Sequence, residues 1–188
     1  MKPLILASQS PRRHELLSVL GMPFSVIPPS IEETPVPNES AKEFVIRMAR
    51  EKGMEVASRI TQSVILSADT IVVVDEEILG KPSDAADARR MLRKLSGRAH
   101  SVYTAICVID QVAERTQEGL DSTKVWFREI SEDEISDYLQ RENVLDKAGA
   151  YGIQGYAGIY IPRIEGNYHN VMGLPLFMVH EFLCRTLR

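Results

Sequence analysis

The sequence has little cysteine and no long apolar run, and each shortage excludes a class of protein. Its two cysteines, Cys107 and Cys184, are far apart and lie in apolar surroundings. We therefore expect buried thiols in a reducing compartment, with neither a disulfide framework nor a zinc site. No apolar run approaches the roughly 20 residues that cross a bilayer. The opening residues MKPLILASQSPRR lack the basic start of a signal peptide, so we expect a cytoplasmic protein with no membrane association.

Positive charge is not in excess either. Lys and Arg number 22 against 26 Asp and Glu, which gives a formal net charge of -4. Proteins that grip nucleic acid are usually basic and stack bases on aromatic side chains, whereas this chain has one tryptophan, Trp126. We therefore expect no nucleic-acid partner. The 188 residues, 44% of them hydrophobic, suit one domain with a real core, or two small lobes that share a sheet.

Strand and helix patterns alternate along the chain. Apolar runs predict strands at 3–7, 24–27, 63–79 (broken by SADT, with a turn at 75–77), 100–109, 121–128 and 159–164. Helices are expected at 11–20, from the capping boxes at Ser40 and Ser131, at 84–95, and from Pro175 to the end. The prolines at 28–37 predict a loop over 28–39. Adjacent strands imply antiparallel as well as parallel pairs, so we expect an α/β fold with a mixed sheet flanked by helices.

The first candidate site lies where the strand at 3–7 leads through Ser8 and Ser10 into a helix that carries Arg12 and Arg13. Free N–H groups and the positive end of the dipole bind anions at a helix start, and guanidinium groups suit phosphate oxygens. Each charge-assisted hydrogen bond contributes roughly 1.5–3 kcal/mol. The same pattern equally predicts a plain helix cap followed by two solvated arginines.

Charged residues at three other places are further candidates. Asp69 interrupts an apolar segment, which indicates either a polar break in the strand or a carboxylate that binds Mg²⁺ or orients a water. Glu33, in the proline-rich loop, has the oxygen ligands that divalent ions prefer, although such carboxylates are more often simple surface charge. For Lys52, inside a helix, the pattern favours a solvated face.

Two later loops could approach a ligand. Lys81 stands in the stiff turn Gly80-Lys81-Pro82, and Gln154 ends the glycine-rich stretch 147–155. Glycine permits close backbone approach, and a glutamine amide can read a base edge because it both donates and accepts. No Gly-Lys-Ser/Thr follows, so this is no Walker loop, and a flexible loop is the alternative. The four histidines show no metal-ligand spacing.

Taken together, these segments resemble the Maf family of nucleoside triphosphate pyrophosphatases. The matching pieces stand in family order and cover nearly the whole chain: LASQSPRRHELL at 6–17, IEE at 31–33, AREKG around Lys52, SADTIVV at 67–73, LGKP at 79–82, MLRKLSGRAHSVYTA at 91–105, DKAGAYGIQG at 146–155 and VMGLPL at 171–176. Gln9 is a minor departure, since a small residue is common there. The DKAGAYGIQG segment is similar to that of the subgroup that hydrolyses dTTP and UTP.

The resemblance implies hydrolysis of dTTP or UTP, and of modified uridine triphosphates, to the monophosphate and pyrophosphate, with Mg²⁺ or Mn²⁺ as cofactor. It implies that Asp69 is the catalytic base or a metal ligand, with Glu33 as second metal ligand. The substrate-binding residues that it implies are Ser8, Arg12, Arg13, Lys52, Thr70, Lys81 and Gln154. Of these, Arg12, Thr70 and Gln154 would set specificity.

The resemblance also implies an architecture and an alternative function. It implies one domain over residues 1–188, with the elongated, twisted sheet, two lobes and central cleft of the inosine triphosphate pyrophosphatases, and a homodimer. The family is also associated with inhibition of septum formation, so a non-catalytic nucleotide-binding regulator of cell division is the alternative function. Such a sensor would need the basic residues but no water-activating Asp69.

Overall fold

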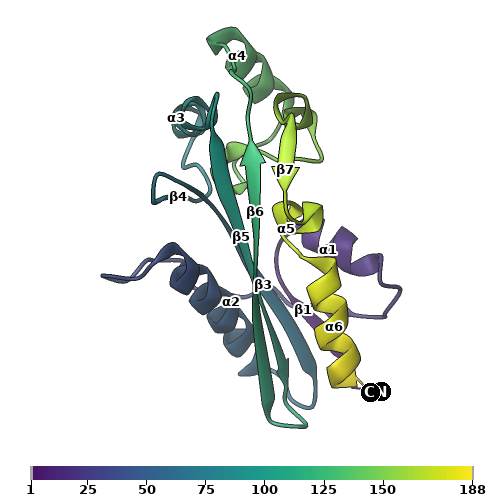
Figure 1. Cartoon of the computed structure of the whole chain (residues 1–188). Coiled ribbons are helices and arrows are strands. Elements are labelled where there is room, and N and C mark those ends of the chain that lie inside the picture. The colour runs from purple at the N-terminus through teal and green to yellow at the C-terminus, as the bar shows by residue number, and fades with distance from the viewer. Residues whose placement is uncertain (1, 188) are drawn as a thin grey trace. The chain divides into compact units, whose positions relative to one another are not determined.

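The computed structural model describes residues 2–187, and in this part of the chain strands and helices are interleaved (Figure 1). The strands are β1 (Leu4–Ala7), β2 (Ser25–Val26), β3 (Val64–Val74), β4 (Glu77–Leu79), β5 (Ala99–Asp110), β6 (Arg115–Trp126) and β7 (Arg163–Glu165). The helices are α1 (Pro11–Ser18), α2 (Ala41–Ala57), α3 (Ala85–Leu95), α4 (Glu132–Arg141), α5 (Tyr168–Met172) and α6 (Leu176–Leu187).

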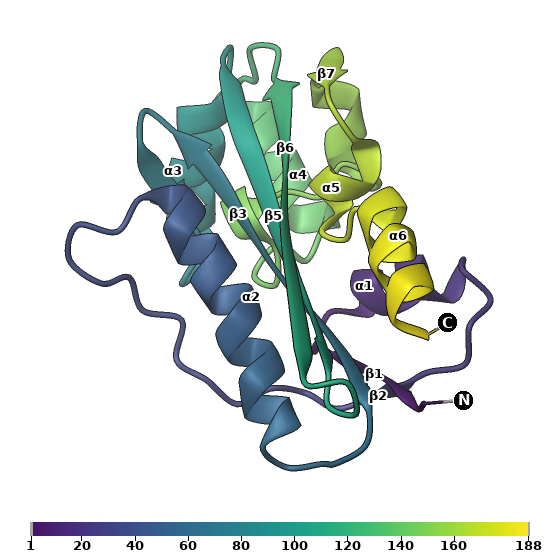
Figure 2. The ribbon, with the colours of Figure 1, turned by 60° about the horizontal axis from the view of Figure 1, so that its bottom comes forward.

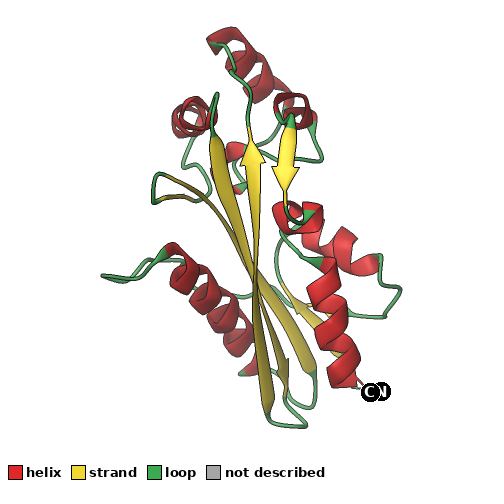
Figure 3. Ribbon diagram, viewed as in Figure 1, coloured by secondary structure: helices red, strands yellow, loops and turns green. Residues whose placement is uncertain are grey.

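The strands form one mixed sheet in the order β2-β1-β3-β5-β6-β7, with β4 paired to β3. Figure 3 distinguishes these strands from the helices and loops. The expected mixed α/β fold is therefore confirmed. The chain divides into two compact units: unit 1 comprises the residues up to Asp69, Thr104–Asp121 and the residues from Gly173 on, and unit 2 comprises Thr70–Tyr103 and Ser122–Met172.

In unit 1, β1 pairs in parallel with both β2 and β3, and Ala7 lies opposite Ser67. Helix α2 lies on one side of these strands, and α1 and α6 lie together on the other (Figure 2). The predicted capping box starts α2, because Ser40 and Glu43 each bond the other's backbone N–H. The helix then buries its apolar residues, from Phe44 to Val56, so one face of α2 is fixed on the sheet.

In unit 2, β3 turns into β4 at Asp75 and Glu76, both at positive φ. A second capping box, formed by Ser131 and Glu134, starts α4. The core includes large side chains from β3, α3, α4 and the 3-10 turn at Tyr156–Tyr160, among them Val72, Leu92, Ile135, Tyr138 and Tyr160.

Several boundaries differ from the sequence prediction. Strand β3 runs unbroken through SADT, because the buried Asp69 is ion-paired and needs no break. Strand β6 pairs with β5 and begins at Arg115, well before the predicted 121. Its first half is polar and partly exposed, so it lacks the apolar pattern that predicts a strand. The strand predicted at 159–164 is partly the 3-10 turn Tyr156–Tyr160, and only Arg163–Glu165 are strand. The short α5 was not predicted, and Arg188, in the predicted last helix, lies outside the described residues.

Two further expectations concern cysteines and membranes. Cys107 is buried and Cys184 is only half-buried, and both are free, so the prediction of buried thiols is right for Cys107 alone. Among residues 2–187 no helix combines the length and the apolar character that crossing a membrane would require.

Candidate active site

The start of α1 has the capped geometry that the sequence predicts, and anion binding there stays a prediction. Pro11 is the first helical residue, and the Ser10 side chain accepts the backbone N–H of Arg13 as the N-cap. The buried Ser8 Oγ accepts the N–H of Ser10 at 3.1 Å and lies 3.5 Å from Nη1 of Arg13. The strand end, the cap and the first helical turn are therefore one hydrogen-bonded unit, and the prediction of a helix cap is confirmed.

The Arg13 guanidinium is held in one orientation. Its Nε donates to the carbonyl of Gly173 at 2.8 Å. Burial lowers the pKa of Arg13 below its usual value, Asp69 and Glu33 raise it, and Arg12 lowers it. Two carboxylates and two guanidinium groups therefore act on one another in unit 1. No role was predicted for Gly173 itself. The sequence signal that could have found it is its place in the VMGLPL segment, and the structure shows a positive φ of 105° there, a backbone conformation that favours glycine.

Lys52 joins the two acidic candidates. Its Nζ lies 2.6 Å from Asp69 Oδ1 and 2.8 Å from Glu33 Oε1. The side chains of Lys52 and Asp69 are 8% and 5% exposed, and that of Glu33 is 41% exposed. The favoured prediction of a solvated Lys52 is therefore wrong. Its ammonium instead compensates the buried Asp69, which would be costly to bury alone.

A close contact between α2 and β3 places this lysine. A Cβ on Gly53 would lie 2.7 Å from Ser67 Oγ, and that hydroxyl donates to the Ala49 carbonyl at 2.6 Å. Ser67 and Asp69 are two residues apart in β3 and so face the same side of the sheet. Because Gly53 lets the helix approach at Ser67, the neighbouring Lys52 reaches Asp69.

The carboxylates fit a divalent cation. Asp69 Oδ2 is buried and has no hydrogen-bond partner, although Oδ1 is paired with Lys52. Mg²⁺ is commonly held by one or two carboxylates together with substrate phosphates, and Asp69 and Glu33 supply such a pair. No group of three or more His, Cys, Asp or Glu within residues 2–187 is arranged to hold a metal, so a cation here would need ligands from the substrate or water.

The other three predicted substrate-binding residues belong to unit 2. Thr70 is half-buried in β3, while Lys81 and Gln154 are exposed in loops. The N–H of Gly149 donates to the Gly80 carbonyl at 3.0 Å, which ties the loop of Lys81 to the glycine-rich stretch. Gly149 has a φ of 68°, and a Cβ there would lie 2.9 Å from Val72. The stretch is thus hydrogen-bonded and packed on β3, and the functional roles of these three residues stay predictions.

The described site thus combines a helix start that carries two arginines, a buried lysine and two carboxylates on a mixed α/β scaffold. The family model described as "Maf-like protein" matches residues 3–186. The chain belongs to this family, which confirms the resemblance seen in the sequence.

Several similar proteins carry the name dTTP/UTP pyrophosphatase. The one from Vibrio vulnificus (strain YJ016) is 44% identical over an alignment of 188 positions, which covers 97% of this chain and 100% of that protein. The one from Escherichia coli (strain K12) is 47% identical over 184 residues, 97% of this chain and 92% of that protein. A solved HAM1 protein from Coxiella burnetii aligns at 19% identity and a TM-score of 0.45, over 68% of this chain and 73% of that one, a likeness too weak to bear on the argument.

Proposed function

We propose that this protein is a nucleoside triphosphate pyrophosphatase that converts dTTP and UTP to the monophosphate and pyrophosphate. The observation that carries the proposal is the buried Lys52–Asp69 pair, in which Asp69 Oδ2 has no hydrogen-bond partner. The names of relatives that match over 92–100% of their length supply the substrate class. A protein that only senses nucleotides would need the cationic side chains but no proton acceptor. The pair therefore does not support that alternative function.

The cationic side chains bind the phosphate chain in this proposal. Arg12 and Arg13 stand at the start of α1, and the guanidinium of Arg13 is fixed by Gly173. Guanidinium groups fixed in advance stabilise negative charge that develops in the transition state, because they need no reorganisation when it appears. We assign Lys52 and Lys81 to the same task, with Ser8 as a hydroxyl donor.

The hydrolysis transfers the nucleotidyl group to water. The water oxygen attacks the α-phosphorus, the bond from that phosphorus to the α–β bridging oxygen breaks, and pyrophosphate leaves with the electron pair. Asp69 takes the water proton at Oδ2. Mg²⁺ or Mn²⁺, held by Asp69 and Glu33, would supply charge neutralisation and a lower pKa for bound water. A carboxylate alone is a weak base for water, and a bound cation would make that water more acidic. We therefore assign Asp69 both roles, metal ligand and proton acceptor.

The test is incubation with dTTP, UTP, CTP, ATP and GTP in H₂¹⁸O with Mg²⁺, beside Asp69→Asn. We expect monophosphate and pyrophosphate from dTTP and UTP, with ¹⁸O in the monophosphate, and a loss of roughly 10²–10⁴-fold in the variant, the usual contribution of a general base. Thermal stabilisation by UTP checks that the variant still folds and binds. Diphosphate plus phosphate, or ¹⁸O in pyrophosphate, would mean a different scissile bond.

The same experiment decides the alternative function. A non-catalytic nucleotide-binding regulator of cell division would be stabilised by UTP without any turnover, and Asp69→Asn would leave its binding unchanged. We keep the cytoplasmic location and the homodimer as predictions. Light scattering of the purified protein tests the homodimer, with twice the chain mass of 21.1 kDa as the expected value.

A further inference from the structure

The proline-rich loop 28–39, which carries Glu33, is fastened near both of its ends to α2 or to the residues that directly follow α2. Near its start, Arg59 donates to the Pro28 carbonyl at 2.7 Å, and Glu55 Oε2 accepts the N–H of Ser30 at 3.1 Å. Near its end, Arg47 binds it at Thr34 and Glu39. Glu33 thus lies between two attachments.

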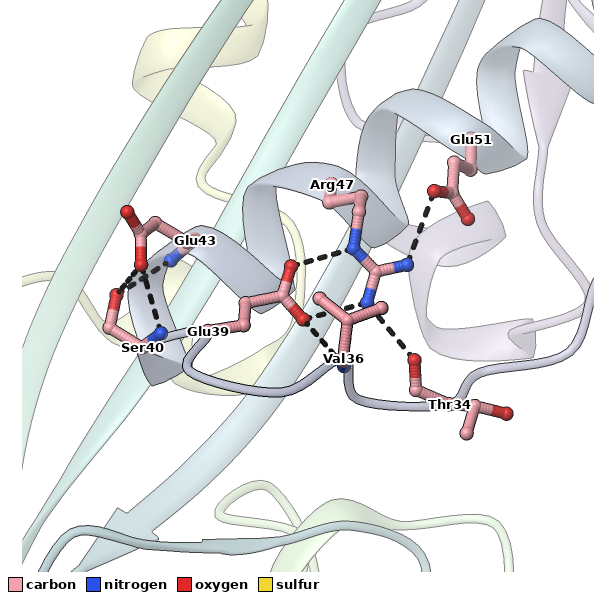
Figure 4. Close-up of polar contacts among 7 residues, drawn as sticks. All are labelled: Thr34, Val36, Glu39, Ser40, Glu43, Arg47 and Glu51. Carbon is pink, nitrogen blue, oxygen red and sulfur yellow. Dashed lines mark hydrogen bonds and ion pairs between the residues drawn. The ribbon is translucent and has the colours of Figure 1, made fainter.

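The attachment at Arg47 is the more shielded of the two (Figure 4). Its Nε and Nη2 donate to the two carboxylate oxygens of Glu39 at 2.6 and 2.7 Å, and Nη2 also donates to the Thr34 carbonyl at 3.0 Å. Nη1 donates to Glu51 at 3.1 Å. The side chains of Glu39 and Arg47 are 7% and 23% exposed, so this two-pronged pair is partly screened from water and is stronger than an ordinary surface pair.

Arg47 binds the backbone of the same loop segment that carries Glu33. Thr34 follows Glu33 directly, and its carbonyl belongs to the Thr34–Pro35 peptide, so the bond from Arg47 fixes the backbone one residue beyond Glu33. The Glu33 side chain is 41% exposed, and its place 2.8 Å from Lys52 Nζ depends on where this peptide stands. Lys52 in turn pairs with Asp69. Arg47 therefore fixes the loop backbone next to Glu33, and Lys52 joins Glu33 to Asp69.

We infer that Arg47 is a positioning residue that holds Glu33 beside Asp69 and thereby sets the affinity for the divalent cation. The inference rests on the proposed function, because the cation is the one that the proposed reaction uses. Groups that orient metal ligands typically contribute 10–100-fold to metal affinity. We expect a change of that size when Arg47 is replaced, although its own hydrogen bonds go to Thr34, Glu39 and Glu51.

The variants are Arg47→Met, Arg47→Lys and, as matched control, Arg50→Met. Arg50 lies on the same helix and makes a two-pronged pair with Glu118 without touching the loop. Lysine at position 47 keeps the charge but loses the fork that binds Glu39 and Thr34 together, so it should recover only part of the effect. Glu39→Gln weakens the same attachment from the loop side and serves if Arg47→Met does not fold.

The first measurement is Mn²⁺ binding by electron paramagnetic resonance, with a non-hydrolysable UTP analogue present. We expect the Mn²⁺ Kd to rise at least 10-fold in Arg47→Met and to stay within about twofold in Arg50→Met. Added to Glu33→Gln, Arg47→Met should change the Kd no further, because it acts through Glu33. Equal Kd values in Arg47→Met and the wild type, or full additivity with Glu33→Gln, would overturn the inference.

The second measurement needs no ligand. Glutamyl endopeptidase should cut after Glu32, Glu33 or Glu39 faster in Arg47→Met than in Arg50→Met, because the loop is released; equal cleavage would also overturn the inference.

Failure of the proposed function gives a different result. A protein that binds Mn²⁺ with the expected shifts but releases no pyrophosphate would keep the inference and refute the enzyme, whereas a wild type that binds no Mn²⁺ refutes both.

Discussion

Gln154 is the residue that we expect to read the base. It is exposed on the glycine-rich stretch of unit 2, and its amide can both donate to and accept from the O4 and N3 edge of uracil or thymine. Gln154→Glu removes the donor, so we expect kcat/KM for UTP and dTTP to fall by roughly 10²-fold or more, as sites built around such bonds do when one is lost. Inhibition by inorganic tripolyphosphate, which has no base, should change little. An equal loss for both ligands would show that Gln154 acts on the phosphates instead.

The residues that the sequence could place are those whose evidence is local. Ser10, Pro11 and Arg13 stand within one turn of helix, so their pattern alone predicts a capped helix start with cations on it. The pairing of Lys52 with Asp69 joins positions that are 17 residues apart, and it depends on how α2 packs against β3. Charge patterning along one helix cannot show that contact, which explains why a solvated lysine was the favoured prediction.

The elements show the same division between local and distant information. Both capping boxes, of α2 and α4, occur as predicted because they are made within four residues. The predicted break in β3 is wrong because the partner of Asp69 lies on another element. The first half of β6 was missed because its polar residues carry little apolar alternation, and its pairing with β5 makes it a strand.

The contact of α2 with β3 is tested by Gly53→Ala. Helix propensity alone predicts a gain of about 1 kcal/mol, because alanine is the better helix former. The added Cβ would, however, lie 2.7 Å from Ser67 Oγ and 3.1 Å from Ile109, and overpacking of a core costs about 1–3 kcal/mol. We expect net destabilisation in urea unfolding, with weaker Mn²⁺ binding as Lys52 shifts. Gly80→Ala is the control: a Cβ there would have nothing within 4 Å, and stability should change by less than about 0.5 kcal/mol. A Gly53→Ala variant more stable than the wild type would show that α2 and β3 accommodate the added methyl group without strain.

For the whole molecule, we propose that residues 1–188 fold as one domain although they form two compact units. Strands β3, β5 and β6 each have residues in both units, so neither unit is a continuous piece of chain that could keep all of its strands alone. Urea unfolding followed by Trp126 fluorescence, which reports on unit 2, should therefore coincide with far-UV circular dichroism, which reports on both. Separate midpoints would show two domains.

The stability of the folded molecule should also depend on His100. This residue is 3% exposed, its Nε2 lies 2.8 Å from the Tyr151 hydroxyl, and Nδ1 is buried without a partner. Burial lowers the pKa of His100 from 6.5 to about 4. Between those pH values the unfolded chain binds a proton at His100 and the folded chain does not. The stabilisation that the neutral His100 contributes is therefore complete above pH 6.5 and is lost as the pH falls toward 4.

At about 1.36 kcal/mol per pKa unit, the free energy of unfolding of the wild type should fall by roughly 2–3 kcal/mol more than that of His100→Gln between pH 7 and pH 4.5. Urea unfolding of both proteins at the two pH values measures this difference, since the carboxylates titrate alike in each. Equal losses would mean that His100 takes up its proton within the folded structure.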